Sequence, residues 1–471
     1  MSFARCNRTR KLLLLGACAL CGRLVSADMW RIVYEDPAPD VNADHAAGPD
    51  ASAASAASAP TAIDSYQSSH ATVASLIAAD PLTDIDTFLP EFGLAYATAS
   101  PEAAARIEAL PGVQSVTPVQ QEGMTFALGI RYAFTNASAC LRFQRAILPS
   151  TGFWLDHPAI APNINRRLSK SFIPGEGLQF KTPRNQGDSF SHGTWTASLI
   201  AAAHVGNSGI RGVAPAAELV LVKVLSDNGW GSDGLILKGM KYAADSGVDI
   251  INMSLGLGPL QDTKSTAALL TAYKRAVRYV LSKGVAIIAA AGNDSFNFDD
   301  ANDQSVYVPQ DVKGVIVVSA TGPKGWRYKP TANMDRLSYY SNYGANVVDF
   351  AAPGGDIRSM YADSEALCYV PVIKRKVKCY QLDAMLGACC YTPEGGYGYR
   401  WAMGTSAAAP VASGVAALIV SKLGHHVPPA KLEMCMRKTA EDLGEKGRDA
   451  SYGWGLVNAG NVVDLRDCQQ Q

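Results

Sequence analysis

The sequence lacks three features that would point to a nucleic-acid-binding, membrane-embedded or metal-binding protein. It has no excess charge of one sign, because Lys plus Arg and Asp plus Glu both number 42, so we expect no nucleic-acid partner. Beyond the N-terminus no apolar run reaches the roughly 20 residues that cross a bilayer, so we expect no membrane span in the mature form. No histidine lies among the four cysteines of segment 368–390, which disfavours a metal site there. The 471 residues, 48% of them apolar and 42 of them glycine, instead fit a large globular α/β enzyme with tight turns.

The first residues predict export from the cell. An apolar run covers residues 12–20, and four basic residues stand ahead of it: Arg5, Arg8, Arg10 and Lys11. The small residues VSA then offer a cleavage site after Ala27, which completes the layout of a secretory signal peptide over residues 1–27. An uncleaved membrane anchor is the alternative, but the run is too short to span a bilayer comfortably. We therefore expect a secreted protein.

The cysteines also fit an oxidising compartment. Three of the ten leave with the signal peptide, and seven remain: Cys140, Cys368, Cys379, Cys389, Cys390, Cys435 and Cys468. Since seven is odd, at least one is free or pairs with another chain. The four that lie within 368–390 predict a disulfide-stapled insertion near residues 360–400, and reduced, partly buried thiols are the alternative reading.

Residues 28–120 have the pattern of a small α+β domain. We predict strands over 30–34 and 92–98, a helix over 65–79, and a helix over 101–110 with Ser100 as its N-cap. An Ala/Ser-rich, low-complexity insert over 40–61 interrupts this pattern and is predicted to be disordered.

Residues 121–471 predict an α/β domain with a mostly parallel central sheet flanked by helices. Runs that are apolar on both faces suit central parallel strands, and helical segments alternate with them. The predicted strands are 219–225, 249–254, 285–290, 314–320 and 347–351. The predicted helices are 196–203, 234–246, 263–283 and 407–423.

Three short motifs carry side chains suited to peptide hydrolysis. Ser406 stands among small residues in the run MGTSAAAPV, at the start of a predicted helix whose N–H groups favour developing negative charge. His192, in SHGT, can take a hydroxyl proton, and Asn293, in AAGN, can donate to an oxyanion. Taken singly, these residues could be an N-cap serine, a structural histidine and a turn asparagine. Together they predict a nucleophile, a general base and an oxyanion donor.

In this chain order the motifs resemble those of the subtilisin-like serine proteases. The resemblance covers roughly residues 124–464, including the closing segment GWGLVNA at 453–459. It implies the subtilisin-like fold and cleavage of polypeptides through an acyl-enzyme on Ser406, with His192 as base and Asn293 in the oxyanion hole.

The same resemblance implies a propeptide and a substrate groove. Residues 28–120 would be an inhibitor-type propeptide, removed near Gln120 or Gln121, because 103–116 resembles the end of such a domain. A substrate would pair as an added strand with one backbone segment and place a side chain beside another. The residues concerned are Ser254, Leu255, Gly256, Ala291 and Gly292. Relatives often bind structural calcium, but no acidic loop here is specific enough to assign, and no cofactor is assigned.

One expected part, the aspartate that orients the histidine, is missing. The turn that should carry it reads PSTG, and His157 follows Ser150 at the spacing usual in the family, so Ser150 occupies the aspartate position. Asp156 and Asp188 are the alternatives, but the first lacks a following Thr-Gly turn and the second lies only four residues before His192.

The missing acid leaves two functions open. A serine can hydrogen-bond an imidazole but cannot offset its positive charge, so we expect a secreted serine endopeptidase, made as a zymogen, with reduced activity. The alternative is an inactive pseudoprotease that binds polypeptides in the same groove. An α/β hydrolase is disfavoured, because Ser406 lacks the second glycine of a Gly-x-Ser-x-Gly elbow and follows His192 in the chain. Pro149 is also unusual in a predicted central strand, because it removes a ladder donor.

Overall fold

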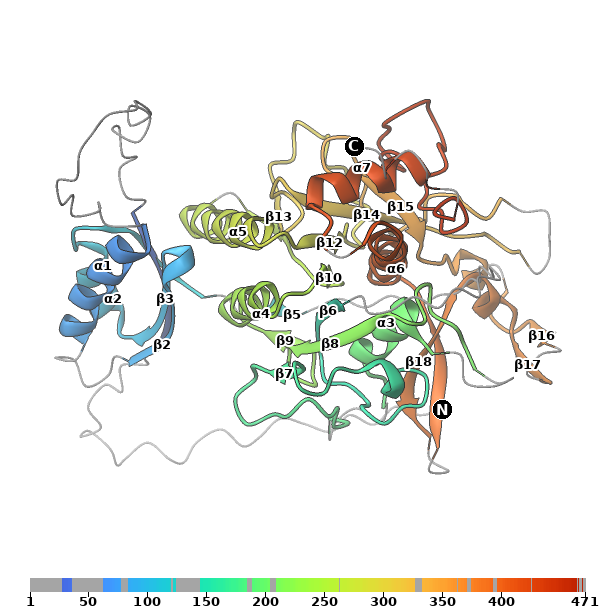
Figure 1. The fold of residues 1–471 in the computed structure, drawn as a ribbon, viewed down its shortest axis with the longest axis horizontal. Coiled ribbons are helices and arrows are strands. Elements are labelled where there is room, and N and C mark those ends of the chain that lie inside the picture. The colour runs from blue at the N-terminus through green and yellow to red at the C-terminus, as the bar shows by residue number, and fades with distance from the viewer. Residues whose placement is uncertain are drawn as a thin grey trace, which may run out of the picture.

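The computed structural model shows a small N-terminal domain packed against a large domain that is built around a parallel sheet (Figure 1). It describes residues 28–35, 62–77, 84–119, 122–123, 145–183, 189–203, 209–261, 263–326, 333–361, 363–370, 374–392, 396–424, 426–463, 465 and 468. The predicted signal peptide, the Ala/Ser-rich insert, the processing site at Gln120 or Gln121, Cys140 and Asp188 lie outside these residues.

Four antiparallel strands and two helices make up the N-terminal domain. The strands are β1 (Asp28–Tyr34), β2 (Asp84–Leu89), β3 (Leu94–Ala99) and β4 (Val113–Pro118), in the order β2-β3-β1-β4. The helices are α1 (Ala62–Ile77) and α2 (Pro101–Glu108), which share an apolar core with one face of the sheet. The Ser100 side chain accepts a hydrogen bond from the Ala103 amide at 3.2 Å, as expected of the predicted N-cap.

Seven parallel strands form the sheet of the large domain, in the order β15-β14-β12-β10-β6-β8-β7. They are β6 (Arg145–Ser150), β7 (Lys170–Ser171), β8 (Glu218–Lys223), β10 (Ile250–Met253), β12 (Ala286–Ala290), β14 (Val315–Thr321) and β15 (Phe350–Pro353). Both β12 and β14 are buried along their whole length, as the continuous apolar runs predict. The predicted α/β fold with a mostly parallel sheet is confirmed.

Helices cover both faces of this sheet. On one face α3 (His192–Ala201) and α6 (Thr405–Leu423) pack against alternate strand residues such as Leu219 and Leu221. On the other face α4 (Asp233–Asp245) and α5 (Lys264–Ser282) pack against Val220 and Val222. Helix α7 (Pro429–Thr439) packs on α6. Within the described chain, α6 is the one helix long and apolar enough to cross a bilayer, and 72% of its apolar window is buried inside the protein.

The helix that carries His192 begins earlier than predicted. We expected it to start at Thr196, but α3 starts at His192 because the Ser191 hydroxyl caps it, accepting a hydrogen bond from the Thr194 amide at 3.0 Å. The proline in β6 is accommodated by the sheet. The ladder with β10 covers only Ala146 and Ile147 and stops before Pro149, where a donor would be missing.

The cysteine-rich insertion consists of two β-hairpins. They are β16 (Leu367–Val370) with β17 (Arg375–Lys378), and β18 (Met385–Tyr391) with β19 (Tyr397–Ala402). Disulfides join Cys368 to Cys379 and Cys389 to Cys390, and a third joins Cys435 to Cys468 near the C-terminus. The remaining strands pair in two short ladders, β5 (Glu122–Gly123) with β9 (Trp230–Gly231), and β11 (Leu257–Leu260) with β13 (Val306–Val308). Short 3-10 helices cover Pro90–Phe92, Ala161–Asn163, Arg358–Tyr361 and Cys379–Asp383.

Candidate active site

The predicted site residues gather at one edge of the parallel sheet. Strands β6, β10 and β12 end there, and Ser150, Ser254 and Asn293 lie at or just after their carboxyl ends. Helices α3 and α6, which pack against each other, begin with His192 and with Thr405-Ser406. This is the edge at which open α/β sheets bind their ligands.

Ser406 is the second residue of α6. Gly404, directly ahead of the helix, has φ 139°, a conformation that side-chain-bearing residues rarely adopt. Because amides in the first turn of a helix have no intrahelical acceptor, the backbone N–H of Ser406 can donate to a ligand, and the helix dipole favours a negative one. The start of α6 therefore combines a hydroxyl with an anion-stabilising backbone.

A buried polar network connects Ser406 to the end of β10. The Ser406 hydroxyl donates to the Ser254 carbonyl at 3.3 Å, and the Ser254 hydroxyl donates to the Ser406 carbonyl at 3.0 Å. The amide of Asn252 donates to the Ser254 hydroxyl at 3.0 Å and accepts from Ser413 at 3.0 Å. Sequence reasoning missed Asn252, although a single polar residue in an apolar strand was a usable signal.

Asn293 lies beside the start of α6 with its amide oriented. Its Oδ1 accepts hydrogen bonds from the Thr405 amide at 2.9 Å and the Thr405 hydroxyl at 3.1 Å. A side chain built on Gly404 would begin 3.7 Å from the Asn293 Nδ2. Since Oδ1 is held by Thr405, the Nδ2 hydrogens are the donors that Asn293 can offer to a bound carbonyl.

His192 is buried at the start of α3, next to the turn that follows β6. The Ser191 hydroxyl donates to the Gly152 carbonyl at 2.6 Å, and the Gly193 amide donates to the Thr151 hydroxyl at 3.2 Å. Burial disfavours the charged imidazolium and lowers the pKa of His192 to about 4. The imidazole is therefore neutral near pH 7, the state that a general base requires.

The backbone of Ser150 ends β6, opposite Lys223 of β8. It directly precedes the Thr151 and Gly152 contacts with α3, so the end of β6 and the helix that carries His192 are adjacent. Asp156 does not take over the acid role, because its side chain is 70% exposed and pairs with Arg166 at 2.8 Å. A triad acid has to contact a buried histidine.

Comparisons with known proteins agree with this geometry. The sequence profile described as "Subtilase family" matches residues 149–455. The chain belongs to the subtilase family. It is 32% identical to Subtilisin Savinase of Lederbergia lenta over 299 residues, which is 63% of this chain and 84% of that protein. It is also 32% identical to M-protease of Shouchella clausii, of which the match spans only 60% of the length.

Solved protease structures have the same fold. A lanthipeptide protease with 28% identity superposes with a TM-score of 0.54 over 68% of this chain and 88% of its own. The epidermin leader peptide processing protease of Staphylococcus aureus superposes with a TM-score of 0.66 over 94% of this chain and 99% of its own. Its identity of 19% makes this second likeness one of fold alone. The chain therefore belongs to a family of serine-type endopeptidases.

The side chain of Gln310 contacts both the end of β12 and the segment that follows β10. The Gln310 amide donates to the Ala290 carbonyl at 2.6 Å, and its nitrogen lies 2.6 Å from where a side chain on Gly256 would begin. The ring of Tyr307 similarly blocks any side chain on Gly258. Leu255 and Ala291 are buried, and the Asn342 amide donates to the Ala291 carbonyl at 3.0 Å. Gln310 therefore ties the end of β12 to the segment that follows β10.

The cysteine-rich insertion holds the helix of His192. The Ser191 amide donates to the Cys389 carbonyl at 2.8 Å, and the Ala388 amide donates to the Ser198 hydroxyl at 3.0 Å. Trp195, 1% exposed, packs directly against Gly387, where no side chain would fit. The insertion, which the sequence located but could not orient, thus packs against the helix that carries His192.

A buried ion cluster lies on the other side of the β6 turn. Lys223 is fully buried and pairs with Asp227 at 2.5 Å and Glu176 at 2.6 Å. Asp227 Oδ1 is so close to Gly152 that a side chain there would collide with it. Sequence reasoning missed this cluster because Glu176 lies in a different segment from Lys223 and Asp227. Across the described ranges, no three His, Cys, Asp or Glu side chains gather as a metal site would require.

Proposed function

We propose that Ser406 is the nucleophile, His192 the general base and Asn293 the oxyanion donor of this subtilase, with Ser150 in the place of the orienting acid. The observation that carries the proposal is the anchoring of Asn293 by Thr405 directly beside Ser406. One short segment thereby presents a nucleophile, a side-chain donor and a helix N-terminus to the same carbonyl group.

The chemistry is acyl transfer. The Ser406 hydroxyl gives up its hydrogen bond to the Ser254 carbonyl and transfers its proton to Nε2 of His192. At the same time its oxygen attacks the peptide carbonyl carbon. Asn293 Nδ2 and the Ser406 amide stabilise the oxyanion. His192 then protonates the leaving nitrogen, the C–N bond breaks, and the acyl group stays on Ser406. A water molecule, deprotonated by His192, hydrolyses this ester and restores the enzyme.

The substrate lies between the segments that follow β10 and β12 as an extended polypeptide. The backbone of Ser254–Gly256 pairs with it as an added strand, and a side chain enters the space beside Ala291 and Gly292.

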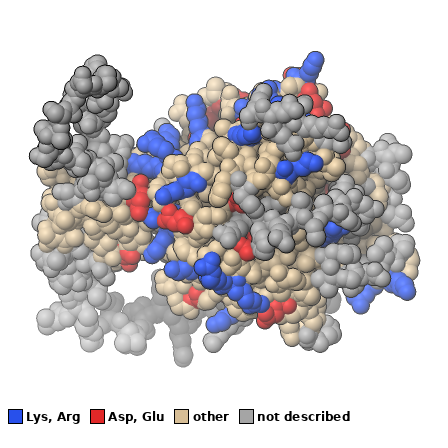
Figure 2. All heavy atoms as spheres, in the orientation of Figure 1, with Lys and Arg blue, Asp and Glu red and all other residues tan. Residues whose placement is uncertain are grey.

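The N-terminal domain acts as an intramolecular inhibitor, and the protein is made as a secreted zymogen. The sheet of this domain faces helices α4 and α5 (Figure 1). Acidic and basic side chains meet along that boundary (Figure 2), including the pair Lys241–Glu91 at 3.1 Å. Arg275 of α5 donates to the carbonyl of Tyr34 at 2.9 Å. After this domain, Glu122–Gly123 continues as an antiparallel strand on β9.

A second function, a pseudoprotease that binds polypeptides without cutting them, is favoured by one observation. Ser150 offers no charge to hold an imidazolium, and burial already disfavours the protonated form of His192. Transfer of the Ser406 proton to His192 then has little driving force.

A fluorophosphonate probe separates the two functions. Purified protein freed of its N-terminal domain is exposed to the probe, which reacts with an activated serine, alongside a Ser406→Ala variant. We expect labelling that disappears in the variant. Well-folded protein that stays unlabelled would establish the pseudoprotease.

Replacing Asn293 with alanine tests the oxyanion donor. We expect kcat to fall by about 10²–10³ with little change in KM, because the donor acts on charge that develops in the transition state. Steady-state kinetics on a fluorogenic peptide measures both constants. Asn302→Ala is the matched control, since Asn302 is exposed and, among the residues that the structure describes, hydrogen-bonds to Asp300 within its own turn. Equal decreases of kcat in the two variants would show that Asn293 is not the oxyanion donor.

A further inference from the structure

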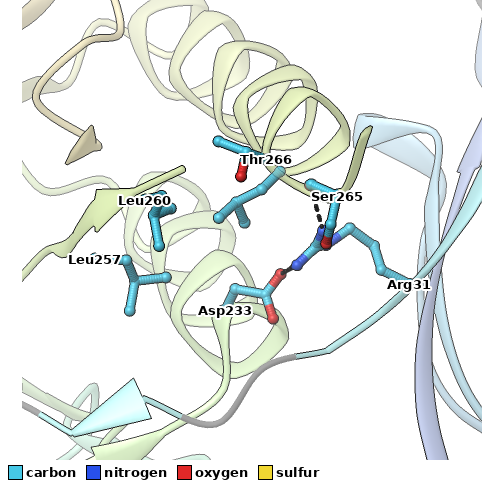
Figure 3. Close-up of a pocket in the computed structure, with 7 residues that line it drawn as sticks. Arg31, Asp233, Leu257, Leu260, Ser265 and Thr266 are labelled. Atoms are coloured by element: carbon cyan, nitrogen blue, oxygen red, sulfur yellow. Dashed lines mark hydrogen bonds and ion pairs between the residues drawn. The ribbon is translucent and has the colours of Figure 1, made fainter. Parts of the chain in front are cut away.

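A narrow slot lies where the N-terminal domain meets α4, α5 and β11 (Figure 3). Leu257, Leu260 and Leu269 line it, and Asp233, the first residue of α4, lies at its end. Arg31 of β1 enters the slot from the N-terminal domain. The cavity that remains is about 30 Å³, room for a water molecule but not for a second side chain.

The slot holds a guanidinium against a buried carboxylate. Nε of Arg31 donates to Oδ2 of Asp233 at 2.7 Å, and its Nη1 lies 3.4 Å from the Ser265 carbonyl. The two side chains are 3% and 2% exposed. The Tyr96 hydroxyl also donates to Oδ2, at 3.1 Å, whereas Oδ1 is buried and receives no hydrogen bond from the residues that the structure describes.

Both side-chain donors to Asp233 come from the N-terminal domain. When that domain leaves, the carboxylate remains at the start of α4, beside three leucines. A carboxylate that loses its partner in an apolar slot strongly favours a replacement cation. An arginine suits it better than a lysine, because the planar fork can bond the carboxylate and a neighbouring carbonyl together.

The slot also lies next to a backbone that receives an extended chain. Glu122–Gly123 pairs antiparallel with Trp230–Gly231, and Asp233 follows Gly231 by two residues. A peptide that replaces Glu122–Gly123 on β9 therefore passes close to the N-terminus of α4.

We propose that, after release of the N-terminal domain, the Asp233 slot binds an arginine side chain of the polypeptide substrate. The proposal rests on the proposed function, because it requires the N-terminal domain to leave and an extended peptide to take the groove. In the precursor, Arg31 occupies the slot in which an arginine of the substrate binds in the mature enzyme.

The first experiment tests the slot without any catalysis. In the full chain, Arg31→Ala empties the slot, and thermal unfolding is followed while ethylguanidinium or ethylammonium is added at equal ionic strength. We expect a saturable rise of Tm with ethylguanidinium that exceeds the effect of ethylammonium. It should be absent from the unaltered chain, whose slot is filled, and from the double variant Arg31→Ala, Asp233→Asn. Equal responses in all three proteins would overturn the proposal.

The second experiment uses active enzyme and peptides that differ only in arginine or its neutral isostere citrulline, placed in turn at each position ahead of the cleaved bond. At one position we expect kcat/KM to be about 10- to 100-fold higher for arginine, as fits a charge-assisted hydrogen bond. Asp233→Asn should abolish this ratio. Asp245→Asn, at the other end of α4 and paired with Lys241, should retain it. A ratio near one at every position would overturn the proposal.

Together the two experiments distinguish a failure of the slot proposal from a failure of the proposed function. If Arg31→Ala does not fold, the peptide ratios still decide. If the protein proves inactive towards the fluorophosphonate, the ethylguanidinium rescue decides by itself.

Discussion

Replacing Ser150 with aspartate should raise the kcat of this subtilase for peptides by roughly 10⁴. In subtilisin, loss of the triad aspartate alone lowers kcat by roughly 3 × 10⁴, or about 6 kcal/mol of transition-state stabilisation. A carboxylate at the end of β6 would hold the imidazole tautomer and stabilise the positive charge that His192 acquires during attack. The serine now present can do only the first of these.

The measurement is kcat for a fluorogenic peptide, compared among the unaltered enzyme, Ser150→Asp and Ser150→Asn. The asparagine variant is the matched control, because it has nearly the shape of aspartate without its charge. We expect the kcat of Ser150→Asn to remain close to that of the unaltered enzyme. A folded Ser150→Asp variant without a gain would show that the end of β6 does not face His192, and it would move the acid position elsewhere.

The pH profile provides a second readout of the same substitution. Activity needs neutral His192, so kcat/KM falls as the pH drops through the pKa of this residue in the free enzyme. Burial lowers that pKa to about 4 in the unaltered protein, which places the acid limb near pH 4. A neighbouring carboxylate favours the imidazolium and raises the pKa, so the limb of Ser150→Asp should lie about one to three pH units higher. The acid limb of the Ser150→Asn profile should stay where it is in the unaltered protein.

The sequence singled out the proposed catalytic residues because each stands in a short motif whose local structure already has chemical meaning. Asn293 follows a glycine, Ser406 lies at the start of a helix of small residues, and His192 follows a helix-capping serine. The apolar runs likewise predicted the central strands β8, β10, β12, β14 and β15 and the helices α4, α5 and α6 to within a few residues. They did so because burial on both faces of a sheet leaves a signal in consecutive residues.

Contacts between distant segments could not be predicted in the same way. Arg31 and Asp233 are 202 positions apart, and each alone reads as an ordinary charged residue. The mutual hydrogen bonds of Ser254 and Ser406 span 152 positions. Periodicity shows which face of an element is buried but not which element covers it. The insertion hairpin against α3 and the slot at α4 therefore became visible only in the folded chain.

The cost of removing His192 should depend strongly on which residue occupies position 150. In an intact triad, loss of the histidine lowers kcat by roughly 2 × 10⁶, whereas loss of the aspartate alone costs roughly 3 × 10⁴, because the three residues act as a unit. Here the aspartate is already absent, so His192→Ala should cost only the ratio of these values, about 70-fold. In the Ser150→Asp background the same substitution should cost about 10⁶.

A double-mutant cycle with single-turnover kinetics on an activated ester measures this coupling, with thermal unfolding as the check on folding. The expected coupling is of the order of 10⁴, or about 6 kcal/mol. Equal losses in the two backgrounds would mean that position 150 and His192 act independently. Any gain in kcat from an aspartate at position 150 would then not act through His192. A large coupling, in contrast, would show that the serine protease machinery of this chain is complete apart from one carboxylate, and that His192, Asn293 and Ser406 are already placed to use it.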